Sequence, residues 1–134
     1  MNLQKSLEEG IIIKINPNRA RANNLFQTAQ DSFDIIATLG VNKKSARMIT
    51  RDLYECLRQT AQAKGYEKGY HFKDHTSIQY FLDEALSLPK IAKEFDRLRK
   101  IRNGINYYGD SVSIETAKKI LEEIPIFMSK IKNA

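Results

Sequence analysis

The sequence predicts an all-α protein, an antiparallel up-and-down helical bundle of four to five main helices plus a short N-terminal helix. Helix-forming residues outnumber strand-forming residues in nearly every window of the 134-residue chain, and its hydrophobic fraction of 42% is near the average for globular proteins. Apolar side chains recur at the three- and four-residue spacing of helices that bury one face. A single domain is the default at this length, so residues 1–134 should form one helical domain.

The first expected element is a short helix over residues 2–9, ended by Gly10. The apolar run at residues 11–15 fits either an extended segment or a bent continuation of this helix, and the sequence does not decide between them. Asn16 followed by Pro17 is typical of a helix start, with Asn as the N-cap and Pro at the first helical position. A long helix is therefore expected from this point.

Two long helices should pack antiparallel across a very short turn. The first should end at Gly40, and the second should run from Asn42 to Gly65, a residue that suits the position just after a helix. Residues 64–75 then form an expected loop in which aromatic residues are interleaved with cations. Such a loop can stack bases and neutralise phosphate, or its aromatic side chains can simply cover the end of the bundle.

The remaining helices follow this loop. One is expected over residues 76–86, and Pro89 should open a long basic helix that Gly109 closes. Ser113 is a good N-cap for the last helix. Pro125 lies inside that helix and should kink it, because proline removes a backbone hydrogen bond and crowds the preceding turn.

The net charge and the cysteine content indicate the kind of partner and the cellular compartment. A formal net charge of +6 favours an acidic partner, whether nucleic acid, a nucleotide or an acidic protein face. Cys56 is the only cysteine, so no intrachain disulfide can form, and its place on an apolar stripe predicts a buried structural thiol. No apolar run reaches the length of a membrane span. We therefore expect a cytoplasmic protein without a membrane partner.

Most catalytic templates are missing from the chain. It has no cysteine pair, no His-Glu-x-x-His motif, no phosphate loop of the Gly-x-x-x-x-Gly-Lys type and no Gly-x-Ser-x-Gly elbow. His71 and His75 are four residues apart and could share a metal ion, but we favour a capping or hydrogen-bonding role for His75 beside Asp74. No metal site and no cofactor are predicted.

The most informative residue is Arg102, because it lies on the apolar stripe of its helix between Leu98 and Ile105. Burying an unpaired guanidinium would cost several kcal/mol. Arg102 must therefore meet a carboxylate, a carbonyl, a partner chain or a phosphate. Gly104 is unusual within a helix and suggests that another group approaches the backbone closely there.

Polar and aromatic residues gather around Arg102. A basic helix face is most often only solvated, but the position of Arg102 favours a binding role. The candidate residues for binding nucleic acid or a nucleotide are Arg99, Arg102, Asn103, Asn106, Tyr107 and Tyr108.

The chain resembles the HEPN family, the small helical domains of prokaryotic toxin–antitoxin and nucleotidyltransferase-associated systems. The likeness covers most of the chain and rests on Asn16-Pro17 before a long helix, a second helix over residues 46–65, and Asp74-His75 before a short helix. Its most specific part is the string Leu98-Arg-Lys-Ile-Arg-Asn-Gly-Ile-Asn-Tyr-Tyr-Gly109.

The resemblance implies a helical bundle, often a homodimer in which the Arg-Asn helices of two protomers face each other. Active members are metal-independent ribonucleases in which four to six residues separate an Arg from a following His. Arg102 and Asn103 match this pattern, but Tyr107, Tyr108 and Gly109 stand where the histidine would fall. A phenol with a pKa near 10 is a poor general base at neutral pH, so the departure puts cleavage in doubt and leaves binding intact.

The sequence therefore favours a binding or regulatory subunit, without catalysis, that recognises RNA or a nucleotide or pairs with a minimal nucleotidyltransferase. The alternative is a metal-independent endoribonuclease, in which Arg102 stabilises the charged phosphorane and Tyr107 or His75 replaces the missing base. A third reading, which the resemblance suggests, makes Tyr107 or Tyr108 an acceptor of a transferred nucleotide.

Overall fold

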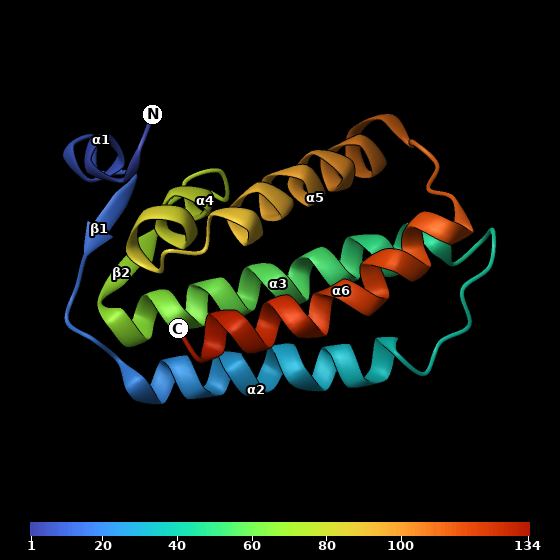
Figure 1. Ribbon diagram of the computed structural model, residues 1–134, viewed down its shortest axis with the longest axis horizontal. Coiled ribbons are helices and arrows are strands. Elements are labelled where there is room, and N and C mark those ends of the chain that lie inside the picture. Colours follow the sequence, from blue (N-terminus) through green and yellow to red (C-terminus); the bar gives the residue numbers. More distant parts are fainter.

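The computed structural model describes residues 1–134 and confirms the predicted all-α class, with one small sheet added (Figure 1). In chain order the elements are α1 (Leu3–Glu8), β1 (Ile12–Lys14), α2 (Arg19–Ile36), α3 (Ala46–Lys68), β2 (Tyr70–Phe72), α4 (Ile78–Tyr80), the π-helical segment η1 (Phe81–Ala85), α5 (Pro89–Tyr108) and α6 (Ile114–Lys132). None of the helices combines the length and the apolar character needed to cross a bilayer.

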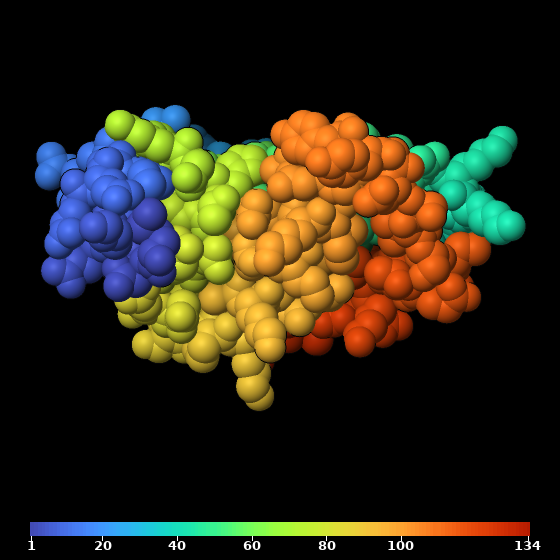
Figure 2. Space-filling model, turned by 90° about the horizontal axis from the view of Figure 1, so that it is seen from above, coloured from blue at the N-terminus to red at the C-terminus, as the bar shows by residue number.

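The longest helix, α3, forms the centre of the bundle, and α2, α5 and α6 pack around it (Figure 1). The side chain of Lys64 on α3 donates a hydrogen bond of 2.9 Å to the carbonyl oxygen of Lys132 at the end of α6. Seen from above, α5 lies over the middle of the molecule, between the segment of α4 and η1 and the turn that follows Gly109 (Figure 2). This arrangement leaves one side of α3 without a covering helix.

We call this uncovered side the open face of α3. Its residues are Arg47, Arg51, Glu55, Arg58 and Gln62, which recur at three- and four-residue spacing and are half-buried or exposed. The residues between them along α3 are mostly buried. The open face is therefore a single polar stripe that runs along most of the length of α3.

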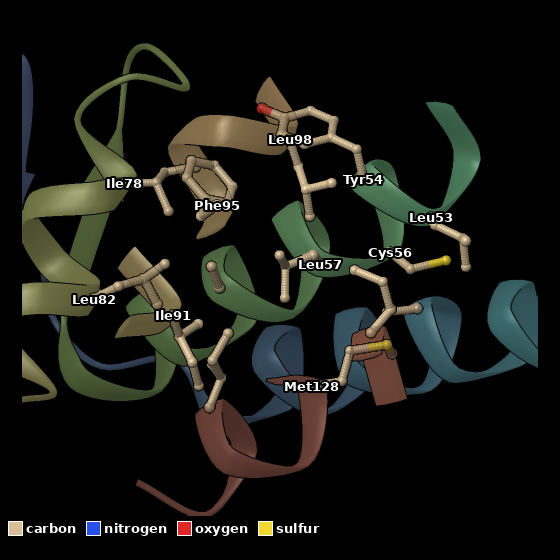
Figure 3. Packing of buried hydrophobic residues seen from close by; sticks show 14 of the residues in the cluster. Leu53, Tyr54, Cys56, Leu57, Ile78, Leu82, Ile91, Phe95, Leu98 and Met128 are labelled. Carbon is tan, nitrogen blue, oxygen red and sulfur yellow. The ribbon is translucent and has the colours of Figure 1, made fainter. Parts of the chain in front are cut away.

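The core gathers on the covered sides of α3. Tyr54 and Leu57 pack with Phe95 and Leu98 of α5, and Ile78 of α4 lies beside them (Figure 3). The ring centroids of Tyr54 and Phe95 are 5.4 Å apart. Burial of such aromatic and branched side chains is the main stabilising contribution and also fixes α5 against α3.

The structure resolves the apolar run after Gly10 as a strand. Ile12, Ile13 and Lys14 pair in antiparallel register with Phe72, His71 and Tyr70. Isoleucine favours extended backbone, and three residues are too few to give a clear alternating pattern. The second strand lies where the sequence predicted a loop, so this part of the prediction was wrong.

The predicted start of α2 was also wrong, by two residues. The N-cap is Asn18, whose side chain accepts a 3.0 Å hydrogen bond from the backbone of Arg21, while Asn16 and Pro17 precede the helix. The helix ends at Ile36, before Gly40, and residues 37–45 form a longer connection than expected.

The predicted end of α3 was too early. Gly65 lies within the helix, where a Cβ atom would fall 2.6 Å from a ring carbon of Phe72, so its role is to let that ring approach. The helix ends at Gly69, whose φ of 87° is the left-handed conformation that glycine adopts readily. At the other end Asn42 caps the backbone of Ser45, and α3 begins at Ala46.

Other expectations are confirmed. Pro89 opens α5, Gly109 closes it with a φ of 66°, and the Ser113 side chain caps α6. The last helix continues through Pro125, and the kink expected there stays a prediction. Cys56 is buried, and burial raises the pKa of its thiol to about 12, so it is a structural residue.

Candidate functional site

Arg102 meets a histidine and a tyrosine. Its Nη2 atom donates a hydrogen bond of 2.9 Å to Nδ1 of His75, and its guanidinium carbon lies 5.0 Å from the centroid of the Tyr54 ring. We call Arg102, Tyr54 and His75 the Arg102 cluster. These residues come from α5, from α3 and from the turn before α4, so packing of the bundle brings them together.

Tyr54 is the rigid part of the cluster. Its side chain is fully buried, and its hydroxyl lies 3.2 Å from Nδ1 of His75. Figure 3 shows this hydroxyl at the edge of the core, close to Leu98. Burial raises the pKa of Tyr54, and the nearby Arg102 offsets this only in part. The phenol therefore keeps its proton at neutral pH and can donate to the imidazole.

His75 is held in its neutral form. Burial lowers its pKa, and the positive charges of Arg58 and Arg102 lower it further. The carboxylates of Glu55 and Asp74 act in the opposite direction without reversing the shift. Nδ1 accepts the hydrogen bond from Arg102, so the neutral ring carries its proton on Nε2.

A neighbouring ion pair on the open face joins Glu55 and Arg58 and does not involve Arg102. Arg58 donates to Glu55 over 3.1 Å and 2.6 Å and also contacts Gln62. Burial acts to raise the pKa of Glu55, but the hydrogen bonds and charge of Arg58 outweigh it, and the pKa lies below its ordinary value. This carboxylate is therefore ionised and already bonded to Arg58.

Arg102 itself has no carboxylate partner. It is half-buried, and its Nε atom is buried without any hydrogen-bond partner. A buried donor without an acceptor costs about 1–3 kcal/mol, and more when it is charged. The cluster thus presents a partly desolvated cation beside a neutral imidazole whose free N–H can also donate, a combination that suits an anionic oxygen ligand.

The other predicted binding residues lie apart from this contact. Arg99 is paired with Asp96 at 2.9 Å, and Lys100 contacts the same carboxylate at 3.1 Å. Burial acts to raise the pKa of Asp96, but the hydrogen bonds from Arg99 and Lys100 outweigh it and hold the pKa below its ordinary value. Arg99 therefore already has a carboxylate partner within α5.

The C-terminal part of α5 points to solvent. Tyr107 and Tyr108 are 71% and 82% exposed, and Asn106 is exposed as well. Asn103 is half-buried and makes no side-chain hydrogen bond. The structure therefore brings Arg102 alone, of the six predicted binding residues, into the cluster with His75 and Tyr54.

Gly104 has the close neighbour that its position suggested. The carboxylate of Asp110, after the turn at Gly109, lies against the Gly104 backbone where a Cβ would otherwise be. The backbone N–H of Asp110 also donates to the Gly104 carbonyl over 3.2 Å. This turn redirects the chain from α5 towards α6.

Sequence reasoning missed Tyr54, Glu55 and Arg58. The Glu55-x-x-Arg58 spacing was a usable signal, since residues three apart on a helix are neighbours. Tyr54 gave no signal beyond an apolar position in α3. Of the two roles expected for His75, the hydrogen-bonding role is confirmed, because its Nδ1 accepts from Arg102. The capping role belongs to Asp74, whose side chain accepts a 2.8 Å hydrogen bond from the backbone of Ser77.

A second contact of the same composition lies near the other end of α3. The hydroxyl of Tyr66 is 3.3 Å from Nδ1 of His71, and the guanidinium carbon of Arg21 lies 4.5 Å from the centroid of the Tyr66 ring. We call Arg21, Tyr66 and His71 the Arg21 cluster. The two histidines that could have shared a metal ion, His71 and His75, therefore contact different tyrosines. No group of three or more His, Cys, Asp or Glu side chains is placed to hold a metal ion.

The aromatic residues of the predicted loop mainly cover the bundle. Tyr66 and Phe72 are buried, and the ring of Phe72 packs edge-on against Phe81. Tyr70 is half-buried and lies under the ammonium of Lys14 at 3.8 Å. Of the two readings of this loop, these positions favour a covering role for the aromatic rings over base stacking.

Comparison with known proteins does not assign this chain to a family. No protein-family model matches the chain, and a search of curated proteins gives no match. The resemblance to the HEPN family therefore stays a prediction based on the residues quoted above.

Proposed function

We propose that this chain is a HEPN-like binding or regulatory subunit that recognises RNA or a nucleotide through a phosphate group at the Arg102 cluster. The observation that carries the proposal is the half-buried guanidinium of Arg102, which has no carboxylate partner and a buried Nε without an acceptor. A phosphate supplies several acceptor oxygens and the opposite charge. The chain's positive net charge of +6 would assist its approach.

The hydrogen bonds within the cluster favour binding over cleavage. A general base needs a nitrogen with a free lone pair, but Nδ1 of His75 accepts from Arg102 and Nε2 then carries the proton. In this tautomer the imidazole donates a hydrogen bond to a ligand. Tyr107, the other candidate base, is 71% exposed and lies outside the cluster.

The same proposal includes two protein partners, a nucleotidyltransferase and a second copy of this chain. The exposed rings of Tyr107 and Tyr108 at the end of α5 offer contact area to a partner protein such as a minimal nucleotidyltransferase of a toxin–antitoxin-type system. The resemblance also implies a homodimer, which light scattering on the purified protein would detect. The single reduced cysteine agrees with a cytoplasmic location.

One observation supports the alternative, a metal-independent endoribonuclease. His75 lies 2.9 Å from Arg102, so the bundle supplies an imidazole beside the motif arginine although the motif lacks one. A phosphate that drew the guanidinium away would leave the Tyr54 hydroxyl as the remaining donor to Nδ1 of His75, and rotation of that hydroxyl would free the nitrogen. That nitrogen could then take the proton of a ribose 2′-hydroxyl while Arg102 stabilised the phosphorane charge.

A gel experiment separates the two functions. End-labelled RNA is incubated in chelator with the wild type and with Arg102→Ala, and each mixture is run on a native and on a denaturing gel. We expect a shifted band on the native gel for the wild type alone, with intact RNA on the denaturing gel. Arg102-dependent fragments would establish the ribonuclease instead, and an identical shift for both proteins would contradict the role of Arg102.

A further inference from the structure

We propose that the Arg21 cluster is a second phosphate-binding site for the nucleic acid that binds the Arg102 cluster, so that the ligand is an extended single strand of nucleic acid instead of a mononucleotide. The inference rests on the proposed function and names its ligand class.

The Arg21 guanidinium is held over an aromatic ring but has no anionic partner. It lies over the buried ring of Tyr66, which is held in turn by its hydrogen bond to His71. Arg21 makes no ion pair and its side chain donates no hydrogen bond within the chain. A guanidinium that stacks on an aromatic ring keeps its N–H edge free, and this edge matches the oxygens of a phosphate.

The two clusters are anchored on one rigid helix. Tyr66 follows Tyr54 by twelve residues of α3, which corresponds to about 18 Å along the helix axis. Arg102 reaches Tyr54 from α5, and Arg21 reaches Tyr66 from α2, so the clusters flank the open face of α3 on its two sides. A ligand that contacts both must therefore cross the open face obliquely.

The charges between the clusters are already paired. On the open face Arg58 is bonded to Glu55, and Arg51 lies 3.6 Å from its neighbour Asp52. Along α3 between Tyr54 and Tyr66 both cations, Arg58 and Lys64, are paired with a carboxylate, whereas Arg21 and Arg102 make no ion pair. Along this part of α3, attraction for a polyanion is therefore stronger at the two clusters than between them.

This separation excludes a single nucleotide as the complete ligand. Stacked nucleotides rise about 3.4 Å each along a strand, so about five of them are needed to span 18 Å. The tyrosine rings of both clusters are buried and cannot stack on bases, so contact with the nucleic acid is made through phosphate oxygens, without sequence preference.

A length series tests the inference. Fluorescein-labelled oligouridylates of two, four, eight and twelve nucleotides are titrated with the wild type, and anisotropy gives the affinity. We expect affinity to rise at least tenfold between the dimer and the octamer and to change little beyond it. An unlabelled DNA octamer serves as a competitor and should compete about as well as an unlabelled RNA octamer, because both strands present the same phosphate oxygens. A DNA octamer that failed to compete would contradict contact through phosphate oxygens alone.

A pair of variants tests the role of Arg21 itself. Arg21→Ala should weaken octamer binding about fivefold and lower the slope of log affinity against log salt by about 0.7, the value for one lost phosphate contact on a single strand. Arg19→Ala is the matched control, because Arg19 is an exposed cation two residues away on α2 that contacts no aromatic ring. Circular dichroism of both variants checks that α2 is intact.

The outcomes separate the inference from the proposed function. Octamer binding that depends on Arg102 but responds equally to Arg21→Ala and Arg19→Ala, with no gain from dimer to octamer, would overturn the second site alone. If no oligonucleotide bound the wild type, or if binding were unaffected by Arg102→Ala, the proposed function would fall as well.

Discussion

The Arg102 cluster and the Arg21 cluster consist of the same three residue types around a tyrosine of α3, but they differ in the burial of the cation. Arg102 is half-buried and donates to His75, whereas Arg21 is exposed and only stacks on Tyr66. Losing water is costly for an ion, so a buried cation needs a partner more than an exposed one does. Burial therefore makes an anion more important to the Arg102 cluster than to the Arg21 cluster.

The largest expected difference is in the free energy of unfolding when the tyrosine of each cluster is replaced by alanine. Tyr54→Ala should lower the free energy of unfolding by about 3–5 kcal/mol, because a fully buried ring in contact with Phe95 is removed. Tyr66→Ala should cost less, since Tyr66 is 8% exposed and belongs to a smaller apolar group. Urea denaturation of both variants measures this. A larger loss for Tyr66→Ala would mean that the two clusters are not ranked by burial.

A smaller effect is expected from pH. The pKa of His75 is lower in the folded protein than its ordinary value of 6.5, so the unfolded chain binds the proton more readily. The contribution of His75 to stability is complete above about pH 6.5 and is lost as the pH falls through the folded pKa. Stability measured in urea from pH 7.5 to pH 5 should therefore decline.

The variant His75→Gln should flatten that decline. His71→Gln is the matched control, because it also removes one imidazole that is bonded to a buried tyrosine. Wild-type stability that stayed level or increased towards pH 5 would show that the imidazole is not held neutral.

The smallest expected effect is that of single hydroxyl groups. Tyr54→Phe and Tyr66→Phe each remove one hydrogen bond to a histidine Nδ1 and should cost about 1 kcal/mol. The loss at Tyr54 should be the smaller one, because Arg102 still donates to Nδ1 of His75. Chemical denaturation resolves the difference, and a clearly larger loss for Tyr54→Phe would mean that Arg102 does not satisfy that nitrogen.

Local patterns in the sequence were sufficient to predict the helices and the unusual position of Arg102. Pro89, Gly109 and Ser113 mark helix ends by their own backbone and capping chemistry, so their roles could be assigned from neighbouring residues. The apolar spacing around Arg102 likewise placed its stem on a buried stripe. These features depend on residues within a few positions of one another.

The partners of Arg102 could not be predicted in this way. His75 lies 27 residues away, and its position depends on β2, a three-residue strand too short to leave a pattern in the sequence. The same strand explains the misplaced end of α3, because Phe72 packs against Gly65 and the helix continues to Lys68. Contacts set by tertiary packing were therefore missed, while those set by local chemistry were found.

The central claim is that Arg102 is retained for a ligand and not for the fold. Arg102→Met tests it most directly, because methionine keeps an apolar stem on the stripe and removes the charge. RNA affinity and the free energy of unfolding are measured on the same preparation. We predict that affinity falls at least tenfold while stability changes by less than about 1 kcal/mol, since a cation without a carboxylate partner is removed. A loss of about 3 kcal/mol or more in stability with unchanged RNA affinity would contradict the claim and make Arg102 a structural residue.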